Sequence, residues 1–204
     1  MEFCLQAVGL LLAAGHSRRF GHADKLHQPL ADGRMLAVAA AQHLISALPQ
    51  SVAVIREHDQ ALAHALATEG LQIVECTEAQ QEMSASLVLG MHYLRHPFPK
   101  ASGVVIVLAD MPFILPSTIS AVAQQLDAGA GIVLPRYQGK RGHPVGFSQA
   151  YFEALCAISG DTGAREVITR HPQSVVYLEC DDAGILMDID TPDDLRSLDQ
   201  TAKR

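Results

Sequence analysis

Residues 104–108 read Val-Val-Ile-Val-Leu, and residues 109–112 continue Ala-Asp-Met-Pro. Five consecutive apolar residues, four of them β-branched, are typical of a strand that helices cover on both faces, as in the centre of a parallel sheet. Shorter apolar runs at 8–12 and 51–55 alternate with longer amphipathic stretches. This alternation predicts an α/β fold with three layers, in which a mostly parallel, Rossmann-like sheet lies between two layers of helices.

The same alternation of short apolar runs and amphipathic stretches is expected along the whole chain. Strands are predicted at 8–12, 51–55, 71–74, 104–108, 132–134, 145–147, 175–178 and 185–187. Helices are predicted at 36–48, 60–67, 84–94, 117–126, 149–158 and 164–170, and from 192 onward. Because no linker or repeat interrupts this series, we expect a single domain over residues 1–204.

The composition excludes several classes of protein. Of 204 residues, 49% are hydrophobic and 18% are charged, which is enough apolar material for a sizeable core. The net charge of −7 disfavours nucleic acid and anionic membrane as partners. The four cysteines lack the spacing of a disulfide framework or zinc cluster. With no basic signal-peptide start and no apolar run near the roughly 20 residues of a membrane helix, we expect a cytoplasmic protein.

The loop after the first predicted strand carries groups that bind phosphate. Residues 13–25 read Ala-Ala-Gly-His-Ser-Arg-Arg-Phe-Gly-His-Ala-Asp-Lys. Small residues such as Gly15 let backbone N–H groups approach an anion, and Arg18 and Lys25 add positive charge. Since ligands of open α/β sheets bind beyond the carboxyl ends of strands, we interpret this loop as a cradle for a nucleoside triphosphate, with an ordinary loop bearing surface cations as the alternative. The loop matches neither the P-loop nor G-x-G-x-x-G, which disfavours an NAD-dependent oxidoreductase.

Two acidic segments are candidates for holding the magnesium ion of a triphosphate. Asp110 directly follows the central predicted strand, at the same edge of the sheet as the first loop. Mg²⁺ is commonly held by one or two carboxylates plus phosphate oxygens, so Asp110 is a candidate ligand; a turn role before Pro112 is the alternative. Residues 188–195 read Asp-Ile-Asp-Thr-Pro-Asp-Asp-Leu, and in an extended segment Asp188 and Asp190 point to the same side.

The end of this second segment also has the pattern of a helix start. Thr191 is a suitable N-cap, and Pro192 suits the first helical position. Asp193 and Asp194 place negative charge near the helix N-terminus. We therefore interpret these last two carboxylates as capping charges and not as metal ligands.

Several motifs together resemble those of one enzyme family. They are Leu-x-Ala-Ala-Gly-x-Ser-x-Arg-x-Gly-x-x-x-Lys at 11–25, Met-x-x-Ser-Leu at 83–87, Asp-Met-Pro at 110–112, Pro-Arg-Tyr-x-Gly-x-x-Gly-His-Pro at 135–144, Gly-Asp-x-Gly-Ala-Arg at 160–165 and Asp-Ile-Asp-Thr-Pro-x-Asp-Leu at 188–195. They resemble the nucleotidyltransferases related to molybdenum cofactor cytidylyl- and guanylyltransferase. The resemblance spans nearly the whole chain, with Glu82 where the family usually has glycine, and implies a glycosyltransferase-A-like fold.

The resemblance also implies a role for individual residues. The implied nucleotide-binding residues are Ala13, Ala14, Gly15, Ser17, Arg18, Lys25, Met83 and Ser84. The implied catalytic residues are Arg18, Lys25 and Asp110, and the implied metal ligands are Asp110 and Asp190. The implied acceptor-binding residues are Arg141, His143, Asp161 and Asp188. The alternatives to these binding roles are structural: a solvated hairpin at 135–144, and helix caps at Ser84 and Asp161.

The implied reaction transfers CMP from CTP to the terminal phosphate of molybdopterin, with Mg²⁺ as cofactor and pyrophosphate as the second product. The implied recipient of the finished cofactor is a molybdenum hydroxylase. Ala14 favours CTP, because the guanylyl branch tends to have glycine there and a Cβ narrows the floor under the base. The alternatives are a guanylyltransferase, a sugar- or alditol-phosphate cytidylyltransferase, and a non-catalytic carrier of the cofactor. The carrier is disfavoured because passive binding does not need the two carboxylates Asp110 and Asp190.

Overall fold

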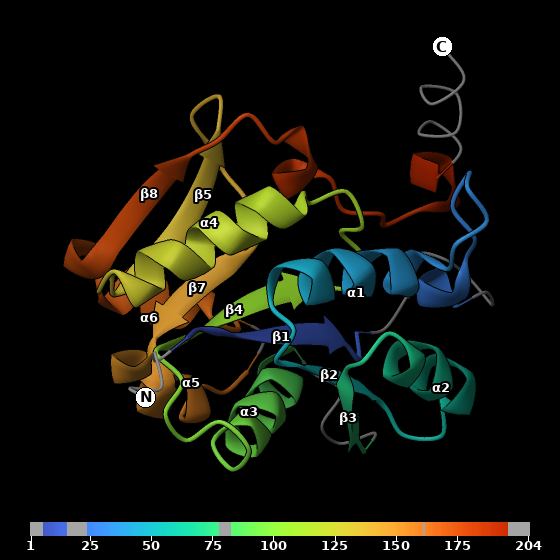
Figure 1. Cartoon of the computed structure of the whole chain (residues 1–204), viewed down its shortest axis with the longest axis horizontal. Helices are drawn as coiled ribbons and strands as arrows, with labels where there is room; N and C mark the ends of the chain where they lie inside the picture. Colours follow the sequence, from blue (N-terminus) through green and yellow to red (C-terminus); the bar gives the residue numbers. More distant parts are fainter. Residues whose placement is uncertain (1–5, 16–23, 78–82, 161, 196–204) are drawn as a thin grey trace.

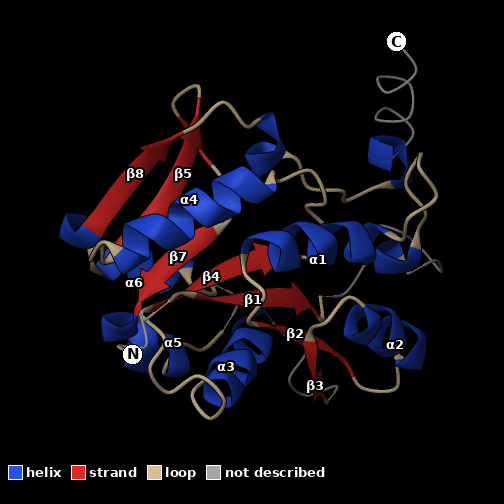
Figure 2. Ribbon diagram, in the orientation of Figure 1, coloured by secondary structure: helices blue, strands red, loops and turns tan. Residues whose placement is uncertain are grey.

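The computed structural model describes residues 6–15, 24–77, 83–160 and 162–195. These residues form one twisted sheet with helices on both faces, so the predicted α/β fold is confirmed (Figures 1 and 2). None of the helices in the described residues combines the length and the apolar character needed to cross a membrane.

The bounds of the elements follow the apolar runs of the sequence closely. The strands are β1 (Val8–Ala13), β2 (Ser51–Arg56), β3 (Gln72–Cys76), β4 (Gly103–Leu108), β5 (Ile132–Tyr137), β6 (Lys140–Arg141), β7 (Val145–Ser148) and β8 (Val175–Glu179). The α-helices are α1 (Leu36–Ala47), α2 (Gln60–Thr68), α3 (Met83–Leu94), α4 (Pro116–Asp127), α5 (Phe152–Cys156) and α6 (Arg165–Arg170). Short 3₁₀ turns are η1 (Lys25–His27), η3 (Gln149–Tyr151), η4 (Pro172–Ser174) and η5 (Ala183–Leu186).

The order of the strands places a ligand-binding edge between β1 and β4. The sheet runs β3-β2-β1-β4-β7-β5-β6, with β8 parallel to β5. Strands β1 to β4 are parallel, and Leu12 of β1 is the register partner of Leu108 of β4, so both strands end at the same edge. From β1 the chain winds outward to β2 and β3, and β4 lies on the other side of β1. Ligands of open α/β sheets bind outside the carboxyl ends of strands at such a reversal.

Alternating side chains of the central strands build two cores, one on each face of the sheet. Leu11 and Val107 point toward α1, α2 and α4, whereas Leu10 and Ile106 point toward α3 and α5. Burying each such side chain stabilises the fold by roughly 1.5–3 kcal/mol relative to exposure. Because a shift of one residue would send each side chain to the opposite face, this packing fixes where β1 and β4 end.

The structure corrects two predicted elements near α4. The predicted strand at 185–187 is wrong: the chain there forms η5, and the carboxylate of Asp182 accepts a hydrogen bond from the N–H of Gly184. The helix predicted to start with Ser117 as its cap instead has Pro116 in its first turn and Leu115 as its N-cap. A proline fits the first helical turn because its missing N–H would have no partner within the helix.

Candidate active site

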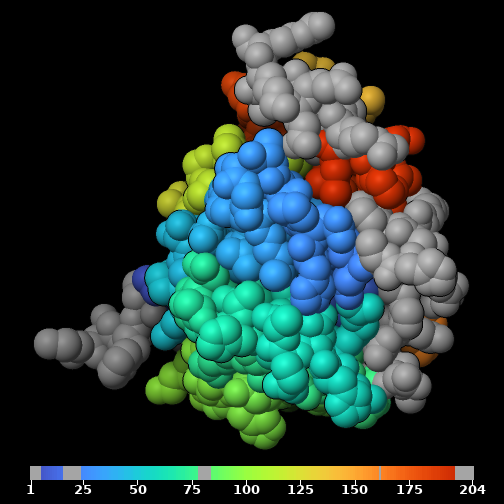
Figure 3. Space-filling view, turned by 90° about the vertical axis from the view of Figure 1, so that its right-hand side faces the viewer, coloured from blue at the N-terminus to red at the C-terminus, as the bar shows by residue number. Residues whose placement is uncertain are grey.

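Three segments far apart in the chain meet where β1 and β4 end. The N–H of Ala109 donates to the carbonyl of Leu12 at 3.0 Å, which holds the residue after it, Asp110, beside the end of β1. The N–H of Ile189 donates to the carbonyl of Asp110 at 2.9 Å and docks the segment that carries Asp190. Figure 3 faces this edge, and the blue segment after Asp24 adjoins the red segment near Asp190 there.

The ammonium group of Lys25 bridges the carboxylates of Asp110 and Asp190. Its Nζ donates to Oδ2 of Asp110 at 2.8 Å and to Oδ1 of Asp190 at 3.0 Å. The Lys25 side chain is only 10% exposed. Burial lowers the pKa of Lys25, but the charge of Asp110 and the hydrogen bonds to both carboxylates outweigh it and raise that pKa above its ordinary value. Lys25 is therefore charged at neutral pH, and two acidic side chains share one cation.

One oxygen of Asp110 fits a further ligand at this cluster. Its Oδ1 is buried and accepts no hydrogen bond from any residue that the structure describes. Buried polar atoms are nearly always paired in proteins, so an unpaired carboxylate oxygen indicates a missing donor or cation. Mg²⁺ and Mn²⁺ favour such oxygen ligands. The donor set at Asp110 and Asp190 thus fits a hard divalent cation.

His143, a predicted acceptor-binding residue, lies where the charge of Asp110 acts on its ring. Its N–H donates to the carbonyl of Ile185 at 3.0 Å, and a Cβ on Gly142 would lie 2.2 Å from that oxygen, so glycine is needed for this approach. The ring Nδ1 of His143 is buried without a partner among the described residues. Burial lowers the pKa of His143, although the charges of Asp110 and Asp188 act to raise it. The imidazole is accordingly neutral at pH 7.

The other acceptor-side candidates lie farther from this cluster or outside the described residues. Arg141 is exposed on β6 and forms no ion pair with an acidic residue in the described part of the chain. Asp188 is exposed, two residues before Asp190, and its charge acts on the pKa of His143. Asp161 lies outside the described residues.

The nucleotide-side candidates are only partly described. Ala13 and Ala14 are buried at the end of β1, while the following Gly15 is exposed. A Cβ on Gly15 would meet no atom of the described residues within 4 Å. Ser17 and Arg18 lie outside the described residues, so their predicted contacts stay predictions.

The start of α3 is tied to the loop before α6. Met83 is the first residue of α3, followed by Ser84. The Ser84 side chain is buried, and its hydroxyl accepts a hydrogen bond from the N–H of Gly163 at 3.2 Å. Because α3 already begins at Met83, Ser84 is not the N-cap of this helix, which was the structural alternative to nucleotide binding. It joins a predicted nucleotide-binding segment to a predicted acceptor-binding segment.

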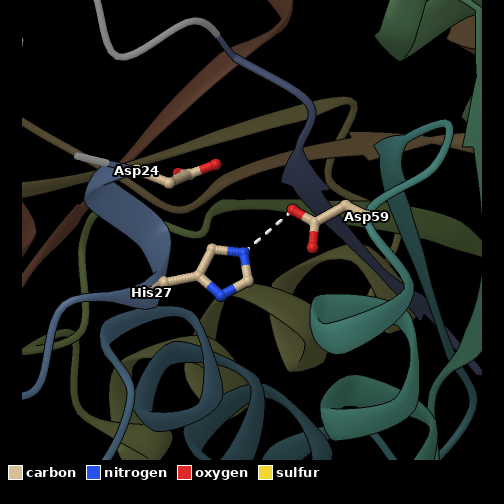
Figure 4. Close-up of side chains that lie close together, drawn as sticks. All are labelled: Asp24, His27 and Asp59. Atoms are coloured by element: carbon tan, nitrogen blue, oxygen red, sulfur yellow. Dashed lines mark hydrogen bonds and ion pairs between the residues drawn. The ribbon is translucent and has the colours of Figure 1, made fainter. Parts of the chain in front are cut away.

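A second charged cluster holds the turn that carries Lys25. Arg56, at the end of β2, pairs its Nη2 with Asp24 and lies 3.7 Å from Oδ2 of Asp59. His27 lies 2.9 Å from that same Asp59 oxygen (Figure 4). Asp24 and His27 flank Lys25, so η1 is clamped on both sides. These residues could surround a metal ion, but the cation that contacts both carboxylates is Arg56, and we interpret the cluster as an ion-pair clamp.

Sequence reasoning missed both this clamp and Asp182. The buried carboxylate of Asp182 accepts hydrogen bonds from the hydroxyl of Thr118 at 2.7 Å and from the N–H groups of Leu115 and Gly184, both at 2.9 Å. It thereby holds η5, whose Ile185 contacts the backbone of His143. In the sequence Asp182 is simply an acidic residue of a polar loop, and nothing there indicates its role. Asp24, a residue of the clamp, could have been noticed more easily, because it directly precedes the predicted phosphate-binding residue Lys25.

The segment after Asp190 behaves as its helix-start pattern predicts. The N–H of Asp194 donates to the hydroxyl of Thr191 at 3.3 Å. In return, the carboxylate of Asp194 accepts from the N–H groups of Thr191 at 2.7 Å and of Asp190 at 3.0 Å. This reciprocal capping fixes the backbone of Asp190 beside Lys25.

A mostly parallel α/β sheet with a loop cation and two carboxylates at its switch point is typical of enzymes that bind the phosphates of nucleotides. The comparisons with known proteins identify the family. The family model of the MobA-like NTP transferase domain matches residues 9–175. The chain belongs to this family and is a nucleotidyltransferase.

Individual relatives resemble the chain over nearly its whole length. The crystal structure of Rv0371c from Mycobacterium tuberculosis H37Rv is 30% identical, with a TM-score of 0.82 and coverage of 96% of this chain and 98% of that one. A second structure of Rv0371c, a complex with manganese, is 27% identical, with a TM-score of 0.80 and coverage of 96% and 99%. The purine catabolism protein PucB of Bacillus subtilis is 28% identical over 92% of this chain and 93% of its own. The nicotine blue oxidoreductase of Paenarthrobacter nicotinovorans is 25% identical over 93% and 95%.

Proposed function

We propose that this nucleotidyltransferase transfers CMP from CTP to the terminal phosphate of molybdopterin, using Mg²⁺ held by Asp110 and Asp190. The observation that carries the proposal is the contact of Lys25 with both carboxylates at the edge where β1 and β4 end. Such a site combines a mobile positive charge for phosphate with a carboxylate pair for a divalent cation. The molybdopterin acceptor and a molybdenum hydroxylase as recipient follow from the family resemblance of the motifs.

The reaction is a displacement at phosphorus. An oxygen of the acceptor phosphate forms a bond to the α-phosphorus of CTP, and the bond from that phosphorus to the bridging oxygen breaks. Pyrophosphate leaves with the bonding electrons, so negative charge grows on the leaving group. A bound divalent cation supplies charge neutralisation for the triphosphate. Lys25 and Arg18 would balance the charge of the departing pyrophosphate, and most of the catalysis would be positioning.

Three observations support a divalent cation in this site. The Asp110 Oδ1 atom is buried and unpaired among the described residues. The carboxylates of Asp110 and Asp190 approach one common cation, Lys25. Rv0371c, 27% identical to this chain, has a structure in complex with manganese. Mg²⁺ is the natural partner of a triphosphate, and Mn²⁺ accepts the same oxygen ligands.

On the acceptor side, we assign binding of the phosphate and pterin to Arg141, His143, Asp161 and Asp188. His143 is half-buried near Asp110, and its neutral ring can exchange a hydrogen bond with the acceptor without carrying a charge. A phosphate monoester is already an anion at neutral pH, so its oxygen needs little activation by a base. His143 therefore orients the acceptor in this scheme.

Mass analysis of the products tests the reaction directly. Protein is incubated with Mg²⁺, each nucleoside triphosphate in turn, and molybdopterin or phosphorylated sugars. We expect two products, molybdopterin carrying CMP and free pyrophosphate. Preferential transfer of GMP would overturn the assignment of the nucleotide. Transfer only to sugar phosphates would overturn the assignment of the acceptor. Asp110→Asn should lower the rate on the order of 100- to 1000-fold, as loss of one strong electrostatic contact does. Asp181→Asn, at an exposed carboxylate, is the matched control.

The choice of CTP is tested separately at Ala14. This residue is fully buried at the end of β1, so Ala14→Gly removes one methyl group from a packed position. We expect the variant to lose part of its preference for CTP over GTP, roughly tenfold, the scale of one methylene in a pocket. The ratio of kcat/KM for the two nucleotides measures this preference. An unchanged ratio would contradict the role of Ala14 in base selection.

A second candidate function is an oxidoreductase, because the Paenarthrobacter relative bears that name and matches over 93% of this chain. Against it, the loop at 13–25 lacks the dinucleotide-binding pattern, and the second strand ends in Arg56 rather than an acid. Consumption of NADH or NADPH by the protein, without transfer of any nucleotide, would favour this candidate. A carrier of the cofactor would bind the dinucleotide, and its function would survive Asp110→Asn.

A further inference from the structure

We infer that Lys25 stands in the place of the divalent cation until a triphosphate arrives, so that metal enters this site together with the nucleotide and not before it. This inference rests on the proposed metal site at Asp110 and Asp190. It adds an order of binding to that site and assigns Lys25 a role in the unliganded protein.

The geometry of the contacts carries the inference. A single Nζ contacts one oxygen of Asp110 at 2.8 Å and one oxygen of Asp190 at 3.0 Å. A divalent cation held by both carboxylates would lie directly beside the Lys25 ammonium, because Lys25 already contacts one oxygen of each carboxylate. The two cations would also repel each other at such short range, where screening by solvent is weak because the Lys25 side chain is only 10% exposed. Metal binding to both aspartates and the observed position of Lys25 therefore disfavour each other.

The backbone around Lys25 holds this arrangement. The clamp formed by Asp24, Arg56, His27 and Asp59 fixes the residues on either side of Lys25. Lys25 therefore leaves the carboxylates by rotation of its own flexible stem, while η1 stays in place. A triphosphate gives the displaced ammonium new anionic partners and brings its own bound cation. Metal alone brings no new anion for the displaced ammonium, so metal alone binds more weakly than metal together with a triphosphate.

The unpaired oxygen of Asp110 supports an exchange of cations at this point. Lys25 satisfies Oδ2 of Asp110, but Oδ1 stays buried and unpaired among the described residues. The ammonium group therefore satisfies the Asp110 carboxylate only in part. A divalent cation with its waters has more positive charge and more coordination sites to offer, so it completes what Lys25 leaves open.

Binding of Mn²⁺ to the full chain without nucleotide tests the inference. Free Mn²⁺ is followed by electron paramagnetic resonance as it is titrated against the protein. We expect Lys25→Met to bind Mn²⁺ at least about tenfold more tightly than the unaltered protein, because the competing charge is gone. Lys25→Arg, which keeps the charge, and Lys100→Met, which removes an exposed charge before β4 begins, should both bind as weakly as the unaltered protein.

Two further variants keep the result interpretable. Lys25→Gln is neutral but polar and replaces Lys25→Met if circular dichroism shows that the latter does not fold; it should show the same gain. Adding Asp110→Asn to either variant should abolish the gain. Equal affinity of the neutral variants and the unaltered protein, or a gain that survives Asp110→Asn, overturns the inference. Because the readout is Mn²⁺ affinity, this failure is distinct from failure of CMP transfer, which is measured by product mass.

Discussion

His143 illustrates how one half-buried imidazole ring can make stability depend on pH. Burial lowers the pKa of His143 below its ordinary value of 6.5, so the folded protein resists taking up a proton that the unfolded chain accepts. As pH falls through the ordinary value toward the lowered one, the unfolded state gains protons first, and the free energy of unfolding decreases. This contribution is absent above the ordinary pKa, where the ring is neutral in both states.

We therefore predict that His143→Gln flattens the dependence of stability on pH in mildly acidic solution. Urea unfolding in the presence of a chelator, from about pH 7.5 to about pH 5, measures the free energy of unfolding. The unaltered protein should lose stability on the acid side, and the variant should lose less. His96→Gln, at an exposed residue, should follow the unaltered protein. Parallel curves for all three proteins would contradict the prediction.

Among the short elements, η1 is the one on which the site depends most. It has only three residues, too few for a helix to be stable by itself, so side-chain contacts must hold it. Asp24 accepts from the N–H of Leu26 at 3.1 Å and also pairs with Arg56, which joins the turn to the end of β2. Through this joint, a strand that contacts no phosphate in our scheme controls where Lys25 lies.

We predict that Arg56→Met lowers the rate of nucleotidyl transfer by roughly 10- to 100-fold, because a displacement near 1 Å can cost this much. The loss should appear mainly in kcat, and Arg56→Lys should restore part of it by keeping the charge. Arg34→Met is the matched control, since it removes an exposed ion pair with Asp32 from the loop after the same turn. Such exposed pairs contribute at most about 1 kcal/mol. Equal losses in both variants would show that the clamp has no special role.

Across the whole molecule, the candidate site joins segments that the sheet alone brings together. A ligand that contacts the ends of β1 and β4, η1 and the Asp190 segment binds only the folded chain. Its binding free energy therefore adds to the stability of the entire fold.

We predict that CTP with Mg²⁺, at about 100 times the Kd, adds about 2.7 kcal/mol to the free energy of unfolding. For a chain of this size, that corresponds to a rise in Tm of roughly 5–10 °C. Mg²⁺ without nucleotide should shift Tm much less, and GTP with Mg²⁺ less than CTP with Mg²⁺. Asp110→Asn should remove the additional effect of Mg²⁺. A large shift by Mg²⁺ alone would contradict both the order of binding and the role of Lys25.

The elements of this fold could be predicted from sequence because their causes are local. Continuous apolar runs at 104–108 and 8–12 can be buried only as central strands, and β4 and β1 lie where these runs predict them. Lys25 and Asp110 could also be named as candidates, since loops at the carboxyl ends of parallel strands share one edge, whereas Asp190 became a candidate through the family resemblance of its motif. Local patterns failed at 185–187, where the distant packing of Asp182 against α4 favours a turn over a strand.

Tertiary structure alone decided which charges meet. Lys25 lies 85 positions from Asp110 and 165 from Asp190, and no periodicity links residues so far apart. The ion pairs of Arg56 and the hydrogen bonds of Asp182 could not be predicted from the sequence either, because their partners come from other elements. Charged side chains find partners by the positions that the packed strands give them, whereas apolar patterns reflect the period of a single element. For this reason local sequence patterns determined the layers of the fold and the candidate residues. The contacts between those candidate residues depend on the folded structure.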